Sequence, residues 1–369
     1  MRRFLLILLV LFLLNGCGGG GGSNDTTLNI DKDDTTKVTP YSDNPLFSKQ
    51  WYFAKNSEFY ENYGIDQDAH IHPFDAPEYT GKGIKVVIID DALDIHHEDL
   101  AGAVVKSYNV KTNSEDVLPK NDSEFHGTAI AGIIGARSNT LGISGIAPEA
   151  EIYFIRVPFD EFVSESLIID AFYKAKEWGA DVVNCSWGSG DVSDAIKEAI
   201  VDLAKNGRDK KGTIIVFAAG NEDEDIGNDE SAIEEVVAVG STNIYNKRAS
   251  YSNFGQGLDF LAPGGEYIGL ATLDLMGDNG VEDGNYIYHN SFKAFIGTSA
   301  SAPIVSAIVA LLLEANKNLT RVDIFNILKN SSDKIDKTNC NYDETTGHSI
   351  YCGYGKVNLT SSINQILNN

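Results

Sequence analysis

The chain has 369 residues, enough for one large domain or two ordinary ones, and 43% of them are hydrophobic. This composition can build a sizeable core, so it excludes a disordered or fibrous protein. Against 29 Lys and Arg there are 53 Asp and Glu, giving a formal net charge of -24. Such a surface repels a phosphate backbone, so we expect no nucleic-acid partner and favour cationic partners, with simple solubility as the alternative reason for the acidity.

The first residues predict export. Two arginines precede an apolar run at 4–14, which has the charged start and short hydrophobic core of a secretory signal and is too short to span a bilayer comfortably. The sequence LNGC at 14–17 resembles a bacterial lipoprotein box. We therefore expect a signal peptide at 1–16, a lipid on Cys17 and a lipid-anchored location in the bacterial cell envelope, at the outer membrane, cell surface or periplasm. A plain cleaved signal peptide is the alternative.

Composition changes twice after this signal. Residues 17–42 begin with a run of glycines and continue with Asp, Thr, Lys and Asn, which predicts a flexible tether. From residue 43 onward, short β-rich runs alternate with helical stretches, without an internal repeat or a second core. We therefore expect a single domain at 43–369.

The alternation of elements predicts an α/β fold. The runs expected as strands lie at 85–90, 151–157, 181–186 and 213–219. The expected helices lie near 126–137, 164–178, 193–206 and 299–316. Because the strand runs are apolar at every position, both faces of the sheet must be covered. This predicts a mostly parallel sheet between two helical layers, a three-layer α/β/α arrangement.

Four cysteines are present. If Cys17 carries a lipid, Cys340 and Cys352 remain as a pair that can close a short loop by a disulfide in an exported protein. Cys185 lies in an apolar run, which favours a buried hydrophobic side chain over a nucleophile. No His or Cys spacing is typical of a zinc site.

Three polar residues stand where the chemistry of such a sheet collects, near the carboxyl ends of its strands. Asp90 ends the first strand run, His126 opens a helix in HGTAIAGIIGA, and Ser299 opens another in GTSASAP. Each alone is explained as a helix cap or a filler of space. Together they provide a nucleophile, a base and a carboxylate that orients the base. Asn221, directly after the run at 213–219, offers a side-chain amide for an oxyanion.

Four blocks carry a family resemblance. They lie at 86–100, 126–136, 217–221 and 297–303. In this order they resemble the signature blocks of the subtilisin-like serine proteases, the subtilases. Further segments at 43–53, 185–191 and 311–320 resemble the kexin and furin branch of that family.

The resemblance implies a secreted, membrane-tethered serine endopeptidase that acts as a monomer on protein or peptide substrates. Asp90, His126 and Ser299 would form its catalytic triad, and Asn221 would donate to the oxyanion. A catalytically silent binding lipoprotein on the same fold is the alternative. An α/β-hydrolase esterase is excluded, because its serine would come first in the chain, in a G-x-S-x-G turn.

The resemblance also implies a substrate groove. Ser186, Trp187 and Gly188 would pair as an edge with the substrate backbone. Asp191 stands where the furin branch places a carboxylate at the base of the first pocket, which implies a preference for Arg or Lys before the scissile bond. Asp91 would face a basic substrate residue. The alternatives are that Asp191 caps a helix and that Asp91 is a solvated turn residue.

A structural Ca²⁺ ion is the cofactor that the resemblance implies. Its ligands would be oxygens around the loop at 138–148, as a hard cation requires. They are the side chains of Asp99, Asn139 and Asn44 (or its neighbour Asp43) and the carbonyls of Arg137, Leu141 and Ile143.

Some features depart from the family pattern. Ala92 stands where a glycine is usual, which restricts the turn after Asp90. Too few residues follow the GTSASAP block for the β-rich P domain of kexins, so we expect none. The segment at 17–42 is too short and too polar to fold as a propeptide. Maturation would then need only removal of the signal, or a separate folding helper.

Overall fold

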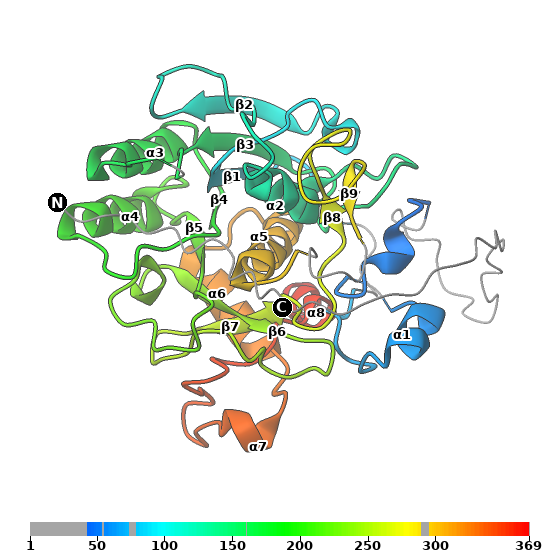
Figure 1. Ribbon diagram of the computed structural model, residues 1–369. Helices are drawn as coiled ribbons and strands as arrows, with labels where there is room; N and C mark the ends of the chain where they lie inside the picture. Colours follow the sequence, from blue (N-terminus) through cyan, green and yellow to red (C-terminus); the bar gives the residue numbers. More distant parts are fainter. Residues whose placement is uncertain (1–42, 54, 74–78, 160, 289–294, 369) are drawn as a thin grey trace, which may run out of the picture.

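The protein is described here by a computed structural model. The described residues are 43–368 except 54, 74–78, 160 and 289–294. The predicted signal peptide, the tether and Cys17 lie outside them. The predicted three-layer α/β/α fold is confirmed (Figure 1).

A seven-stranded sheet forms the centre of the part that the structure describes. Its strands are β1 (Lys85–Asp90), β2 (Val104–Asn109), β3 (Glu151–Arg156), β4 (Val182–Cys185), β5 (Ile214–Ala218), β6 (Val237–Thr242) and β7 (Phe260–Pro263). Their order is β2-β3-β1-β4-β5-β6-β7, and all neighbouring strands are parallel. The four strands predicted from sequence, β3, β1, β4 and β5, are contiguous in the sheet.

Two pairs of helices cover the two faces of the sheet (Figure 1). They are α2 (His126–Gly135) with α5 (Thr298–Ala315), and α3 (Glu165–Glu177) with α4 (Asp194–Asn206). Alternate residues of β1 serve both layers: Val86 and Ile88 belong to the core under α2 and α5, whereas Val87 and Ile89 belong to the core under α3 and α4. All four side chains are fully buried, as the continuous apolar run predicts.

Shorter elements complete the described chain. They are η1 (Phe47–Lys49), α1 (Ser57–Tyr63), η2 (Glu98–Leu100), η3 (Glu230–Ala232), β8 (Thr272–Leu273), β9 (Tyr286–Ile287), α6 (Arg321–Ser331), α7 (Lys337–Cys340) and α8 (Leu359–Leu367). Near the carboxyl end, Cys340 and Cys352 form the predicted disulfide, across a sequence separation of 12. Cys185 is a free, buried cysteine, and burial raises the pKa of its thiol well above the usual value.

Helix α5 is the core helix of the domain. Among the described residues it is the one helix long and apolar enough to cross a membrane, yet 83% of that apolar window is buried inside the protein. It contacts β4, β5, β6 and β7 from one face of the sheet. Its apolar character is therefore explained by packing, and its amino end is fixed against the carboxyl edge of the sheet.

Candidate active site

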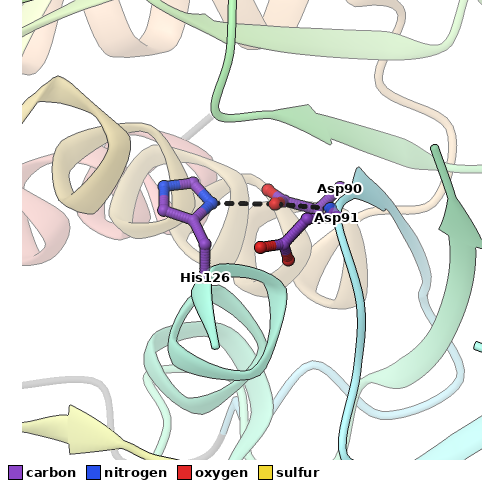
Figure 2. A group of neighbouring side chains, drawn as sticks. All are labelled: Asp90, Asp91 and His126. Atoms are coloured by element: carbon purple, nitrogen blue, oxygen red, sulfur yellow. Dashed lines mark hydrogen bonds and ion pairs between the residues drawn. The ribbon is translucent and has the colours of Figure 1, made fainter. Parts of the chain in front are cut away.

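Asp90 and His126 meet at the carboxyl edge of the sheet. Asp90 is the last residue of β1, His126 is the first residue of α2, and His126 Nδ1 lies 2.8 Å from Asp90 Oδ1 (Figure 2). The helix comes this close because Gly127 has no side chain: a Cβ there would lie 2.3 Å from the carbonyl oxygen of Ala92. Ala92 itself is buried without a positive φ, so the alanine in the place of the family glycine is accommodated without strain.

Asp91 is neither a solvated turn residue nor freely open to substrate. It is 7% exposed, and its Oδ1 accepts the backbone amides of Gly127 at 2.8 Å and Ala92 at 2.5 Å. The carboxylate thus stabilises the first turn of α2, where unpaired amides and the helix dipole favour a negative charge. It also lines the cavity described below.

The two carboxylates control the charge of the imidazole. Burial lowers the pKa of His126, but the charge of Asp90, its hydrogen bond and the charge of Asp91 outweigh this effect and raise the pKa to about 9. Burial and the charge of Asp90 raise the pKa of Asp91 to about 7, against the opposing effects of His126 and the two amides. The pair therefore favours an imidazolium beside Asp90, the state that a general base reaches after taking a proton.

Ser299 is placed by the first turns of α5. Pro303, inside this helix, has no N–H for the carbonyl of Ser299 four residues earlier. That carbonyl instead accepts the hydroxyl of Ser186 at 3.0 Å, and the hydroxyl of Ser299 donates to the carbonyl of Ser186 at 3.0 Å. This reciprocal pair fixes the position of Ser299 against the loop after β4. Its hydroxyl donates to Ser186 here, so donation to His126 requires this hydrogen bond to break.

Asn221 is oriented by Thr298. Its Oδ1 accepts the amide of Thr298 at 2.8 Å and the hydroxyl of Thr298 at 3.1 Å. Because the oxygen is held there, the side-chain NH₂ group is left to face the cavity that Asn221 and Ser299 both line. Asn253 holds the backbone beyond it, since its Oδ1 accepts the amides of Glu222 and Glu224.

These groups surround one cavity of about 430 Å³, and its lining includes all four predicted catalytic residues and the predicted edge. Ser186 and Trp187 are buried, and the indole of Trp187 donates to the carbonyl of Ile89. Gly188 is exposed, and its backbone has no partner among the described residues. The loop therefore offers an open backbone edge along the cavity.

The predicted place of Asp191 at the base of the pocket is wrong. Asp191 does not line the cavity; its side chain is exposed and accepts the side-chain amide of Asn228 at 2.9 Å. It does not cap α4 either, because Ser193 is the N-cap residue of that helix. The three residues before Asp191, at 188–190, line the cavity instead, which spacing in the sequence could not reveal.

Other carboxylates take its place. Glu222, Glu224, Asp225 and Asp229 line the cavity, whereas no Lys or Arg of the described residues does. Asp229 is the buried one of the four and lies directly beneath the edge: a Cβ on Gly188 would lie 2.5 Å from its Oδ2. The cavity is thus strongly negative, although a different carboxylate provides the charge.

The residues predicted to bind calcium come together. Asn44 is 3% exposed, and its Nδ2 lies 2.6 Å from the carbonyls of Leu141 and Ile143 and 3.4 Å from that of Arg137. This nitrogen stands where the three carbonyl oxygens converge, and turning the amide by 180° would replace it with Oδ1.

Asp99 and Asn139 complete the same cluster. Asp99 is fully buried; its Oδ2 accepts the amide of Ile143 at 3.1 Å, and its Oδ1 has no hydrogen-bond partner among the described residues. The side chain of Asn139 lies beside Asp99 and accepts the amide of Leu141. A buried carboxylate oxygen without a donor, next to converging carbonyls, fits a hard cation.

The comparisons with known proteins agree with this fold. Residues 81–355 match the sequence model of the Subtilase family. The chain therefore belongs to the subtilase family, which the arrangement at the sheet edge had already indicated.

Two curated relatives show the extent of the similarity. A protein named calcium-dependent protease from Nostoc sp. is 32% identical over 88% of this chain and 52% of its own length. A thermophilic serine proteinase from Bacillus sp. (strain AK1) is 30% identical over 87% of this chain and 71% of its own length. The chain spans about half the length of the calcium-dependent proteases that it matches.

Solved structures share the fold. The serine protease of Aeromonas sobria, in a complex with a chaperone, has a TM-score of 0.74 at 23% identity, covering 94% of this chain and 70% of that one. Fervidolysin from Fervidobacterium pennivorans has a TM-score of 0.68 at 24% identity, covering 91% of this chain and 48% of its own. At these identities the likeness establishes the fold.

Sequence reasoning missed the supporting residues. Thr298 and Pro303 lie inside the GTSASAP block, so the missing amide of proline was a readable signal for the free carbonyl of Ser299. Asn253 and Asp229 lie in segments that can be compared with the furin branch, but their contacts with the site depend on how distant loops fold over the sheet, which the sequence does not show.

We predict that Asp91→Asn lowers the pKa of His126. The amide oxygen of the variant can still accept the amides of Gly127 and Ala92, but the negative charge that favours the imidazolium is gone. NMR titration of the His126 imidazole measures the change. Asp94→Asn is the matched control, because the charge of Asp94 is not among those that act on His126. An unchanged pKa in Asp91→Asn would contradict the electrostatic interpretation.

Proposed function

We propose that this protein is a serine endopeptidase that hydrolyses peptide bonds with Asp90, His126 and Ser299 as its catalytic triad and Asn221 as its oxyanion donor. The observation that carries the proposal is that all four line one cavity, with Asp90 bonded to His126 and Asn221 oriented by Thr298. The family match supports the same reaction class.

In the proposed reaction, the Ser299 hydroxyl turns from Ser186 toward His126 Nε2 and attacks the carbonyl carbon of the substrate. His126 takes the proton and passes it to the leaving amine, and Asp90 holds the tautomer and stabilises the imidazolium. The oxyanion accepts hydrogen bonds from the Asn221 amide and the amino end of α5. Water then hydrolyses the acyl-enzyme by the reverse proton path.

The charge of His126 sets the pH dependence of this reaction. Only neutral imidazole can take a proton, so the rate rises with pH through the pKa of His126, which Asp90 and Asp91 raise. Activity is therefore favoured on the alkaline side and lost on the acidic side. Asp91→Asn would move the acidic limb to lower pH.

We also propose a preference for Arg or Lys before the scissile bond. The support is the excess of carboxylates around the cavity, with Asp229 buried beneath the edge at Gly188 and Asp225 at the rim. A cationic side chain gains charge-assisted hydrogen bonds there, and an apolar one gains none. Asp91 adds to the field through its charge. This preference would agree with the resemblance to the kexin and furin branch.

The oxygen cluster around Asn44 and Asp99 is proposed as a Ca²⁺ site. The ion would draw oxygens from both side chains, from Asn139 and from the carbonyls of the loop at 138–148. Its charge would compensate the buried carboxylate of Asp99. Two relatives carry the name calcium-dependent protease, which supports the proposal. The site would tie Asn44 to the loop after α2, so its role would be structural.

The remaining proposals concern location and maturation. The LNGC sequence supports a lipid on Cys17 that holds the domain at a bacterial envelope membrane through the tether at 17–42. A separate folding helper is a further proposal; the Aeromonas sobria protease, which shares the fold, was crystallised with a chaperone.

We predict that Ser299→Ala folds like the wild type and lowers kcat on a peptide substrate by about 10⁴-fold or more, because no nucleophile remains. Asn221→Ala should lower kcat by about 10²- to 10³-fold, because one oxyanion donor is lost. Initial rates and labelling by a serine-directed phosphonate measure both. Full activity of Ser299→Ala would exclude the mechanism, and an inactive, unlabelled wild type would favour the silent binding protein.

We predict that peptides with Arg or Lys before the scissile bond are cleaved faster than matched peptides with Leu or Phe. Asp229→Asn and Asp225→Asn should each reduce this ratio by roughly 10-fold, the effect of losing one charge-assisted hydrogen bond. Asp191→Asn is the control and should leave the ratio unchanged. A lead for Leu or Phe in the wild type would refute the preference.

We predict that removing Ca²⁺ with a chelator lowers the Tm and that adding Ca²⁺ restores it, because the ion binds only the folded state. Asp99→Asn should weaken this response by removing the charged ligand, whereas Asp94→Asn, outside the cluster, should retain it. Thermal melts with and without chelator provide the measurement. A wild-type Tm insensitive to chelator would mean that the cluster binds no calcium.

We predict that an alkyne fatty acid added to producing cells labels the full chain and that Cys17→Ser abolishes the label. The other cysteines provide the internal control, since Cys340 and Cys352 form a disulfide and Cys185 is buried. Gel fluorescence and membrane fractionation are the measurements. A wild type without label, recovered free of membranes, would indicate a plain signal peptide.

A further inference from the structure

A buried ion pair joins two segments of the active-site edge that are far apart in the chain. Arg156 Nη2 lies 2.6 Å from Glu124 Oε1, and the two side chains are 1% and 4% exposed. Arg156 Nη1 also donates to the carbonyl of Leu118, and Glu124 Oε2 accepts the amide of Lys120. The pair therefore closes the segment at 118–124 onto the end of β3.

The two ends of this pair lie next to the two partners of the catalytic hydrogen bond. Arg156 is the last residue of β3 and is in register with Asp90 on β1, and the amide of Val157 donates to the carbonyl of Asp90 at 2.8 Å. The strands lie side by side in Figure 1. Glu124 stands two residues before His126. The ion pair thus spans from the strand beside Asp90 to the loop that delivers His126.

Stability alone does not explain this pair. Moving two charges out of water is costly, and well-packed apolar side chains in the same place often stabilise a protein equally or better. Arg156 Nε is buried without a hydrogen-bond partner in the described part of the chain, which adds to the cost. Unlike apolar side chains, the guanidinium group of Arg156 makes two directional hydrogen bonds, one to Glu124 and one to the carbonyl of Leu118, and these fix the geometry of the contact.

We propose that Arg156 and Glu124 are positioning residues that hold His126 within reach of Asp90 and Ser299. The inference rests on the proposed peptidase function for its effect on rate. After His126, α2 is already held, because the amide of Gly127 donates to Asp91 and the hydroxyl of Thr128 accepts the amide of Asp94. The ion pair holds the backbone on the other side of His126, at Glu124. The chain is thus held both before and after His126, which fixes the position of the imidazole.

Two consequences separate positioning from a purely structural role. A displacement of about 1 Å at a catalytic group can cost about 10²-fold in rate, so kcat should fall while KM stays nearly constant. Asp90 also raises the pKa of His126 by charge and hydrogen bond. A looser contact between them should therefore lower that pKa, whereas a change in global stability leaves it where it is.

The test is the double variant Arg156→Met/Glu124→Leu in the full chain, which removes both charges and retains apolar volume. We expect a folded protein with kcat on a peptide substrate reduced by about 10²-fold, a similar KM and a lower His126 pKa by NMR titration. The matched control is Arg208→Met/Asp181→Leu. In that pair, 3.3 Å apart with Arg208 5% exposed, Asp181 directly precedes β4 and Arg208 lies between α4 and β5. Both are at the opposite edge of the sheet, so kcat and the His126 pKa should be unchanged.

A second variant guards against failure to fold. Arg156→Lys keeps the charge, but one ammonium group cannot bind Glu124 and the carbonyl of Leu118 in the way that the guanidinium fork does. We therefore expect kcat to fall less than in the double variant. Additives that stabilise the folded state should not restore kcat. Wild-type kcat and His126 pKa in either folded variant would overturn the inference. If the wild type itself cleaves no peptide, the proposed function fails, and the NMR titration of His126 still decides whether the pair positions the imidazole.

Discussion

The parallel arrangement of strands that are buried on both faces is the constraint on which the rest of the structure depends. Because β1, β3, β4 and β5 all run in the same direction, their carboxyl ends meet at one edge, and the polar residues that follow them are collected there. Asp90, Ser186 and Asn221 each follow or end a different strand, yet they line one cavity. Helices α2 and α5 must cover the same face, which brings His126 and Ser299 to the same edge.

Close approach of backbone to backbone is the means by which this edge becomes a site. Gly127 lets α2 contact the turn after β1, and Pro303 frees a carbonyl of α5 that binds the loop after β4. Neither residue lines the cavity, but each removes an obstacle that an ordinary residue would introduce. The site therefore depends on a glycine and a proline in the first turns of two helices. The lack of a side chain in one and of an N–H group in the other lets the backbones approach each other closely.

Negative charge has different uses in different places. Asp90 and Asp91 favour the protonated state of the imidazole, and Asp229 adds negative charge beneath the edge of the cavity. In η2, Asp99 has a buried oxygen that no donor of the described residues reaches. The strongly acidic composition is thus partly concentrated around specific features. Arg156 is a buried positive charge beside the site, paired with Glu124. We propose that it acts through the geometry of this ion pair and not by adding positive charge to the cavity.

The sequence by itself determined the elements whose signals are local. Apolar runs defined the four central strands, and the four family blocks identified Asp90, His126, Asn221 and Ser299, because the residues that these blocks need are adjacent in the chain. The pairing of Cys340 with Cys352 was expected once Cys17 was assigned to a lipid and Cys185 to the apolar core. Only the tertiary structure decided that Asp229 rather than Asp191 lines the cavity, that Asp91 holds α2, and that Arg156 reaches Glu124. These contacts join segments that are far apart in the sequence. The direction of each side chain depends on the conformation of the whole loop that carries it, so a local sequence pattern cannot predict the contact.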